Sequence, residues 1–311
     1  MTAENIATRD AYGEVLVELG EQREDIVVLD ADLSKSTRTI KFGKRFPERF
    51  FNMGIAEQNM IDMACGLAVS GKTVFASSFA IFATGRAWEQ VRNSICYSRY
   101  NVKVVATHAG ISVGEDGVSH QACEDVAIMR AIPNMRVFVP ADAVETKAII
   151  RTIAKDQTPA YVRLGRAKVP VIYDDTYVFH PGKASQLREG SDVALIAMGA
   201  TVVLALEAAA RLAEEQISVR VINMSSVKPI DRDAILAASN ETRAIVTIEE
   251  HNVIGGLGSA VAEVLVTFPH RVPMRMIGLQ DTFAQSGSYT ELFERYGLSV
   301  PNVIRVIKEI L

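Results

Sequence analysis

The chain has 311 residues, of which 49% are hydrophobic and 23% are charged, and its formal net charge is −4. This length is too great for one small core and favours two globular domains. The slightly acidic balance excludes a nucleic-acid-binding protein, because such proteins contact phosphate mainly through clustered Lys and Arg. No apolar run approaches the roughly 20 residues that span a bilayer, so we expect no membrane segment.

The first residues, MTAENIATRDAYGE, are polar and acidic, and they lack the basic-then-apolar pattern of a secretory signal. The cysteines Cys65, Cys96 and Cys123 have no C-x-x-C spacing and are odd in number. Such cysteines are typical of reduced, buried thiols rather than of a disulfide framework. Together these features predict a cytoplasmic protein.

The first half of the chain alternates short apolar runs with longer helical segments. Residues 26–29 (IVVL) form a continuous apolar run, which is typical of a strand buried on both faces of a parallel sheet. We therefore expect a doubly wound α/β domain. Its predicted elements are helix 5–20, strand 26–29, helix 57–70, strand 73–77, helix 80–98, strand 102–107, helix 122–131, strand 135–139, helix 142–156 with Asp142 as N-cap, and strand 160–164.

Between residues 165 and 190 the periodicity is lost, which indicates a linker with one or two short edge strands. A second, smaller α/β run follows it. Its predicted elements are strand 192–198, helix 201–216, strand 218–223, helix 231–239, strand 243–248, helix 256–267, strand 274–277 and helices 289–297 and 301–310. We place the first domain at 1–168, the linker at 169–187 and the second domain at 188–311.

Glu57 lies between a strand-like apolar segment (FFNMGIA) and an apolar helix. A glutamate in the first turn of a helix is usually explained by the helix dipole alone. The apolar residues before it instead predict a buried or half-buried carboxylate, which needs a partner such as a ligand nitrogen.

Phe79 and Phe82 stand at spacing i, i+3 just after the strand at 73–77. Two aromatics at that spacing are usually core residues. Their place at the carboxyl end of a strand also allows them to stack on a flat ligand.

The loop HAGISVGEDGVSHQ begins at His108 and interrupts the strand–helix alternation. Long polar loops at strand ends are usually functional. His108, Glu115, Asp116 and His120 could be metal ligands, but their spacing fits no standard zinc pattern. We therefore predict no metal site and favour a loop that handles protons and binds substrate.

Gly256-Leu-Gly258 follows a strand and opens a helix, as in a dinucleotide site. The full G-x-G-x-x-G pattern is absent, and a lone G-x-G is weak. We interpret it as a tight turn with close helix–sheet packing.

The order GIAEQNM, SSFAIF, ATHAGISVGEDGVSHQ, IPNMRVFVPAD, VRLGRAKVP resembles the pyrimidine-binding domain of transketolases, and EEHNVIGGLGSAVAEVL resembles their C-terminal domain. Full-length transketolases carry a further N-terminal domain with a G-D-G…N motif for magnesium and the cofactor diphosphate. The D-G of this chain, Asp116-Gly117, lies inside the histidine loop. The resemblance therefore implies the C-terminal subunit of a split transketolase, active only with an N-terminal subunit and assembled as a heterotetramer.

The resemblance also implies roles for individual residues in binding thiamine diphosphate. Glu57 matches the glutamate that hydrogen-bonds the pyrimidine ring nitrogen, and it is a candidate catalytic residue with His120. Phe79 and Phe82 match aromatics around that ring, and a third family aromatic would fall at Gly85. Asp32 matches an acid close to the cofactor. The partner subunit would hold Mg²⁺.

For the substrate, the resemblance implies contacts to sugar hydroxyls and phosphate from two groups of residues. His108, Asp116 and His120 match residues of the substrate loop. Arg9, Ser36 and Arg166 match positions that bind the sugar phosphate, which suits arginine because its planar fork forms paired hydrogen bonds. The preferred sugar is not defined, and the route could be pentose phosphate metabolism or a narrower catabolic pathway.

The leading hypothesis is transfer of a two-carbon ketol unit from a ketose phosphate to an aldose phosphate. A beta subunit of a 2-oxoacid dehydrogenase shares the fold, but its substrates need no phosphate clamp. A deoxyxylulose-phosphate-synthase-like enzyme is a closer alternative. A non-catalytic regulatory or binding paralogue is an alternative of another class. The presence of Glu57 and of both histidines argues against this alternative.

Overall fold

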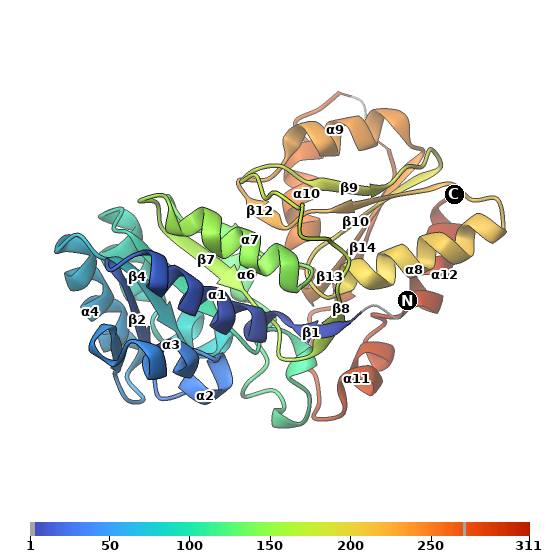
Figure 1. Ribbon diagram of the computed structural model, residues 1–311. Coiled ribbons are helices and arrows are strands. Elements are labelled where there is room, and N and C mark those ends of the chain that lie inside the picture. The colour runs from blue at the N-terminus through green and yellow to red at the C-terminus, as the bar shows by residue number, and fades with distance from the viewer. Residues whose placement is uncertain (1–3, 270–271) are drawn as a thin grey trace.

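A computed structural model describes residues 4–269 and 272–311, and Figure 1 shows them as two α/β units that lie side by side. Within these residues, the first unit is built on a seven-stranded sheet and the second on a five-stranded sheet. A short antiparallel ribbon pairs β1 (Asn5–Ala7) with β8 (Lys168–Pro170). The predicted fold class of two α/β domains is thus confirmed, while the residue boundaries between the domains stay a prediction.

The first sheet is parallel from β3 to β6, as the continuous apolar runs predict. Its strands in spatial order are β12 (Ser226–Lys228), β6 (Arg136–Phe138), β7 (Ala160–Arg163), β5 (Val102–Ala106), β4 (Thr73–Ser77), β2 (Ile26–Asp30) and β3 (Phe50–Asn52). Strand β12 runs antiparallel to β6 and comes from the second half of the chain. The two sequence halves therefore share this sheet.

Helices cover both faces of the first sheet. On one face α1 and α7 pack together and α3 packs against α1, around a core that includes Tyr12, Phe42 and Phe75. The helical segments of this unit are α1 (Thr8–Gln22), α2 (Ser34–Thr37), α3 (Ile40–Arg45), η1 (Pro47–Arg49), α4 (Glu57–Val69), η2 (Phe82–Arg86), α5 (Trp88–Gln90), η3 (Val91–Tyr97), η4 (Ile111–Asp116), α6 (Asp125–Arg130) and α7 (Ala143–Ala154).

The second sheet has the same parallel character apart from its antiparallel edge strand β9. Its strands in spatial order are β14 (Met274–Leu279), β13 (Ala244–Asn252), β10 (Val193–Ala197), β11 (Val219–Asn223) and β9 (Ser185–Arg188). Its helices are α8 (Thr201–Glu214), α9 (Arg232–Glu241), α10 (Leu257–Leu265), α11 (Tyr289–Arg295) and α12 (Val300–Ile310). Within the described ranges, no helix is long and apolar enough to cross a membrane.

Three local predictions differ from the structure. The helix expected over 5–20 begins only at Thr8, because residues 5–7 form β1. The helix expected over 80–98 is broken into the π-helical turns η2 and η3 with α5 between them. The elements α2, α3 and β12 were not predicted, whereas β3 overlaps the start of the segment FFNMGIA, which the sequence indicates as strand-like. By contrast, Asp142 is confirmed as the N-cap of α7, since its side chain accepts a hydrogen bond from Glu145 N.

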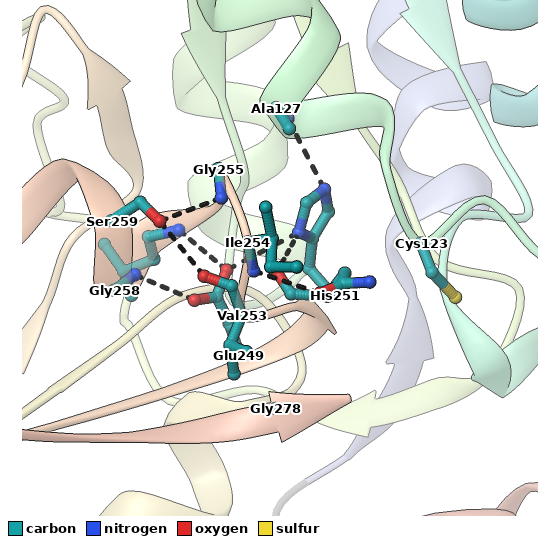
Figure 2. A network of polar contacts seen from close by, with 12 residues as sticks. Cys123, Ala127, Glu249, His251, Val253, Ile254, Gly255, Gly258, Ser259 and Gly278 are labelled. Carbon is teal, nitrogen blue, oxygen red and sulfur yellow. Dashed lines mark hydrogen bonds and ion pairs between the residues drawn. The ribbon is translucent and has the colours of Figure 1, made fainter. Parts of the chain in front are cut away.

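The Gly256-Leu-Gly258 turn is confirmed as a tight helix start packed on the sheet. A Cβ at Gly258 would lie 2.8 Å from the Met276 side chain on β14. The Glu249 carboxylate accepts hydrogen bonds from Leu257 N (2.6 Å) and Gly258 N (2.7 Å), as Figure 2 shows for Gly258. Burial raises the pKa of Glu249 to about 7. The turn is therefore closed by the protein's own carboxylate.

Candidate active site

The candidate site residues gather at the carboxyl edge of the first sheet, where open α/β sheets bind ligands. Phe79 follows β4 and His108 follows β5, and a bridge between Phe79 and Thr107 continues the pairing of these strands beyond their ends. Arg166 follows β7, which is the other neighbour of β5. Adjacent strands therefore present these side chains side by side.

Glu57 is the first residue of α4 and is 4% exposed, which confirms the predicted burial of its carboxylate. Its Oε1 accepts an ion-paired hydrogen bond of 3.0 Å from Arg86 Nη1. Arg86 was not singled out from the sequence. The partner that a buried carboxylate requires is thus supplied by the chain itself.

The aromatic pair lies next to this carboxylate. The Phe79 and Phe82 rings are stacked with centroids 5.8 Å apart and an interplanar angle of 14°. The Arg86 guanidinium lies over the Phe82 ring, 4.0 Å from its centroid. Phe79 is buried and Phe82 is half-buried. A flat, partly covered apolar wall therefore adjoins a buried acid.

His108 connects this wall to a basic region. Its ring stacks on Phe79 with centroids 3.8 Å apart, and its Nε2 lies 3.1 Å from Arg9 Nη1. A guanidinium can only donate, so Nε2 accepts, and Nδ1–H donates to Thr107 Oγ1 at 2.8 Å. Burial, followed by the charge of Arg9, lowers the pKa of His108 to about 3. The imidazole is therefore neutral.

The basic region consists of Arg9, Arg38 and Arg166, and the positive charge of each of them lowers the pKa of His108. In the β1–β8 ribbon Ala7 pairs with Lys168. This pairing brings the start of α1, which carries Arg9, close to the segment between β7 and β8, which carries Arg166. Arg9 Nη1 also donates to Ser36 O at 3.1 Å. Among the described residues, the buried Arg9 Nε has no hydrogen-bond partner. A cationic region with an unused donor is suited to an anion.

The rest of the histidine loop lies over the aromatic pair and against the second unit. His120 is half-buried and meets Phe82 edge-on at 5.4 Å, while its Nδ1 lies 2.9 Å from Ser119 Oγ. Asp116 is exposed. Helix α11 packs against η4, and Figure 1 shows it beside this loop. Ser112 N donates to Glu250 Oε1 at 2.6 Å.

Arg166 is the member of the basic region that contacts this loop. Its Nη1 pairs with Glu115 Oε2 at 3.1 Å and also donates to Val113 O. The loop and the basic region are thus joined through one guanidinium, which is half-exposed and could exchange Glu115 for another anion.

Two further predicted residues, Asp32 and Ser36, lie after strand β2, which is a neighbour of β4. Asp32 is exposed, has a φ of +63° and accepts from Asn52 Nδ2 at 3.1 Å. Ser36 meets Arg9 through its carbonyl rather than through its hydroxyl. Next to them, Asp30 is fully buried, and its carboxylate accepts from Leu33 N, Thr37 Oγ1 and Thr39 Oγ1. Asp30 therefore fixes the turn that carries Asp32 and Ser36.

In the part of the chain that the structure describes, no group of three or more His, Cys, Asp or Glu side chains could hold a metal ion. His108 is engaged by Arg9, and Glu115 by Arg166. The cysteines Cys65, Cys96 and Cys123 are buried free thiols, as expected.

Comparison with known proteins identifies the class. Residues 4–171 match the family model described as "Transketolase, pyrimidine binding domain", and residues 182–303 match "Transketolase, C-terminal domain". The chain belongs to the transketolase family. The expected recognition is thereby confirmed, and a 2-oxoacid dehydrogenase subunit or a regulatory paralogue is not favoured.

Similar proteins of the same extent are described as parts of split enzymes. A Methanocaldococcus jannaschii protein whose name describes a transketolase C-terminal section is 52% identical over 97% of this chain and 95% of its own length. A Phocaeicola vulgatus protein that is named as one subunit of an apulose-4-phosphate transketolase is 39% identical over 98% and 97%. A solved structure described as a split gene transketolase, inactive beta4 tetramer, superposes with a TM-score of 0.92 at 53% identity and covers 98% of both chains.

Proposed function

We propose that this chain is the C-terminal subunit of a thiamine-diphosphate-dependent transketolase, which moves a two-carbon ketol unit from a ketose phosphate to an aldose phosphate. The observation that carries the proposal is the buried Glu57 carboxylate beside the Phe79–Phe82 pair, with His108 between that pair and Arg9. One side of this arrangement suits a flat nitrogen heterocycle, and the other suits a sugar phosphate.

The residues present fit the pyrimidine half of the cofactor. A carboxyl oxygen at the base of an aromatic wall can share a proton with a ring nitrogen, and Phe82 offers a face for stacking. Asp32 is assigned to the rim of this pocket. When bound, the cofactor supplies an electron sink for the two-carbon unit. Glu57 then holds the proton at its carboxyl oxygen, and the wall excludes water.

The residues present do not fit the diphosphate and its metal. Within the described ranges no acidic cluster is available for Mg²⁺. We assign both to a separate N-terminal subunit and expect a heterotetramer of two such subunits with two copies of this chain. The name of the Phocaeicola relative, which describes one subunit of a transketolase, supports a divided enzyme.

We assign Arg9, Ser36, His108 and Arg166 to the sugar phosphate, and Asp116 and His120 to the sugar hydroxyls. Ser119 holds Nδ1 of His120, so Nε2 is the atom that exchanges a proton with a substrate oxygen. Phosphorylated sugars of pentose phosphate metabolism are the first substrates to try. Buried free thiols suit a reducing compartment, and we place the reaction in the cytoplasm.

Reconstitution tests this proposal. The chain should be inactive alone and should become active with an N-terminal subunit, thiamine diphosphate and Mg²⁺, as measured by two-carbon transfer between a ketose phosphate and an aldose phosphate. Activity of the isolated chain would contradict the divided site.

The variant Glu57→Gln tests the acid in the reconstituted enzyme. Loss of the shared proton should lower turnover by about a hundredfold or more, the range of acid–base catalysis. The matched control is Glu207→Gln on α8, where Glu207 forms an exposed i, i+4 pair with Arg211. Equal turnover in both variants would remove Glu57 from its proposed role.

A further inference from the structure

We propose that Arg86 is an internal placeholder: in the chain without cofactor its guanidinium occupies the wall formed by Glu57 and Phe82, and it must withdraw before a flat heterocycle can bind there. This inference rests on the proposed function. It adds a residue that controls access to the site, which neither the family pattern nor the sequence singles out.

The first observation is that Arg86 occupies the carboxylate. Its Nη1 lies 3.0 Å from Glu57 Oε1, and the Glu57 side chain is 4% exposed, whereas that of Arg86 is 51% exposed. A buried carboxylate without a partner is destabilising, so the ion pair stabilises the chain when no cofactor is bound. A ring nitrogen that approached Glu57 Oε1 from the side of Phe82 would need the space that the Arg86 guanidinium fills.

The second observation is that Arg86 also occupies the aromatic face. Its guanidinium carbon lies 4.0 Å from the Phe82 ring centroid. A guanidinium is flat, carries N–H donors and stacks on aromatic rings. In these three respects it resembles a nitrogen heterocycle that stacks on Phe82 while contacting Glu57. The two groups therefore compete for the same two contacts.

The third observation is that the main chain at Arg86 is held by a contact that does not use its half-exposed side chain. Gln58 Nε2 donates to Arg86 O at 3.1 Å, which fixes the main chain independently of the guanidinium. Arg86 ends the π-helical turn η2, a geometry that is frequent at functional sites. At the preceding Gly85, an added Cβ would meet only Ile81 Cδ1, at 3.9 Å. Gly85, the position where the resemblance places a third aromatic, therefore leaves open space beside Arg86.

A placeholder lowers the apparent affinity for the cofactor. The apparent dissociation constant equals the intrinsic one divided by the fraction of molecules in which the wall is open. If nine-tenths of the molecules were closed by Arg86, removal of its charge would tighten binding by roughly tenfold. The pair also protects the subunit before assembly by keeping the Glu57 carboxylate partnered.

The first experiment measures the dissociation constant of thiamine diphosphate by calorimetry in the reconstituted enzyme with saturating Mg²⁺. Arg86→Gln should tighten binding severalfold, while Arg86→Lys, which keeps the charge, should change it less. The control is Arg92→Gln, which removes an exposed arginine that bonds the adjacent residue Asn93. Unchanged or weaker binding in Arg86→Gln overturns the inference.

The second experiment is a thermal-unfolding cycle on the chain alone, which needs no cofactor. Arg86→Gln should lower the melting temperature, and adding Glu57→Gln to it should recover part of the loss, because the unpaired carboxylate is then gone. If the two substitutions change the melting temperature additively, the inference is overturned. If the reconstituted protein bound no thiamine diphosphate at all, the proposed function would fail, while this cycle would still decide whether Arg86 and Glu57 are coupled.

Discussion

At the scale of single residues, His108 determines how the two parts of the candidate site meet. Its ring face covers Phe79, and its Nε2 accepts from Arg9. Because burial and neighbouring arginines lower its pKa to about 3, it does not carry a proton to donate from Nε2 near neutral pH. In the proposed function, proton exchange is therefore assigned to the half-buried His120, and positive charge is assigned to the arginines.

Arg166 offers a direct test of that positive charge. Arg166→Ala should raise the KM for a phosphorylated acceptor by about tenfold, because a charge-assisted hydrogen bond contributes on the order of 1.5 kcal/mol or more. The KM for an unphosphorylated acceptor should change much less. Steady-state kinetics of the reconstituted enzyme would measure both, with Arg211→Ala on α8 as control. Equal effects on both acceptors would show that Arg166 does not contact phosphate.

The sequence allowed some of these residues to be found and not others. Glu57, Phe79 and His108 could be located because each follows a strand or strand-like apolar run, and strand ends mark ligand sites in such sheets. Arg86 could not, because an arginine in a helix-like segment is normally a solvated residue. The approach of Arg9 to Arg166 was also hidden, since it depends on the β1–β8 ribbon, whereas the pattern of residues 5–7 predicts helix.

At the scale of elements, long-range pairing and irregular helices account for the differences from prediction. The segment 80–98 keeps an apolar pattern near the helical period, yet it contains two π-helical turns, which a pattern of side chains does not distinguish from α-helix. Strand β12 is only three residues long and exists because β6 is available beside it. Such pairing is a tertiary property, so local sequence does not specify it.

Asp142 and Glu145 both join helix α7 to the linker, and Asp142 does so at the start of the helix. Asp142 Oδ1 accepts from Glu145 N at 2.8 Å, and its Oδ2 accepts from Ile172 N at 2.7 Å and Tyr173 N at 2.9 Å. Asp142→Ala should lower the free energy of unfolding by about 2 to 4 kcal/mol, since a cap is lost and buried donors are left unpaired. Urea unfolding followed by circular dichroism would measure it.

The matched control lies in the same linker. Asp174→Ala removes an exposed carboxylate that bonds only its local turn at Thr176, so its effect should stay within about 0.5 kcal/mol. Similar losses for the two variants would mean that Asp142 is not a special anchor.

At the scale of the whole molecule, the two units share an apolar core cluster and are also joined by a seam of polar contacts. One apolar core cluster includes residues of both sheets, such as Val104, Ile196 and Ile245. At the seam, the buried Arg163 pairs with Asp125 at 2.9 Å and donates to Glu250 O at 2.8 Å. The histidine loop contacts the same seam through Glu250, so the second unit helps to hold this loop in place.

His251 lies in this seam and links stability to pH. Its Nδ1–H donates to Asn252 O at 2.6 Å. Its Nε2 accepts from Ala127 N at 3.4 Å, and Figure 2 shows this second contact. Burial and, after it, the charge of Arg163 lower the pKa of His251 to about 4 from the usual 6.5, against the opposing charge of Asp125, whose Oδ1 lies 4.0 Å from His251 Nε2. Between pH 6.5 and 4 the unfolded chain therefore binds a proton that the folded chain does not.

This proton difference means that His251 favours folding above pH 6.5 and that its contribution is lost as the pH falls toward 4, with a limiting slope of about 1.4 kcal/mol per pH unit. Glu249 acts in the opposite sense. Because its folded pKa is raised to about 7 from 4.5, its protonated form favours folding at low pH, and that contribution is lost as the pH rises through 7.

The variant His251→Asn should separate the two effects. Between pH 4.5 and 6.5, His251 makes the free energy of unfolding rise with pH, while Glu249 makes it fall. In the variant only the contribution of Glu249 remains. The change in the free energy of unfolding between these two pH values should therefore be more negative in the variant than in the parent chain, whatever the absolute stability of the variant. Urea titrations at half-unit pH steps would give the slopes, and His180→Asn, which replaces an exposed histidine of the linker, should leave the slope unchanged. If His251→Asn had the same slope as the parent chain, His251 would not be the neutral, buried link between the two units that its hydrogen bonds indicate.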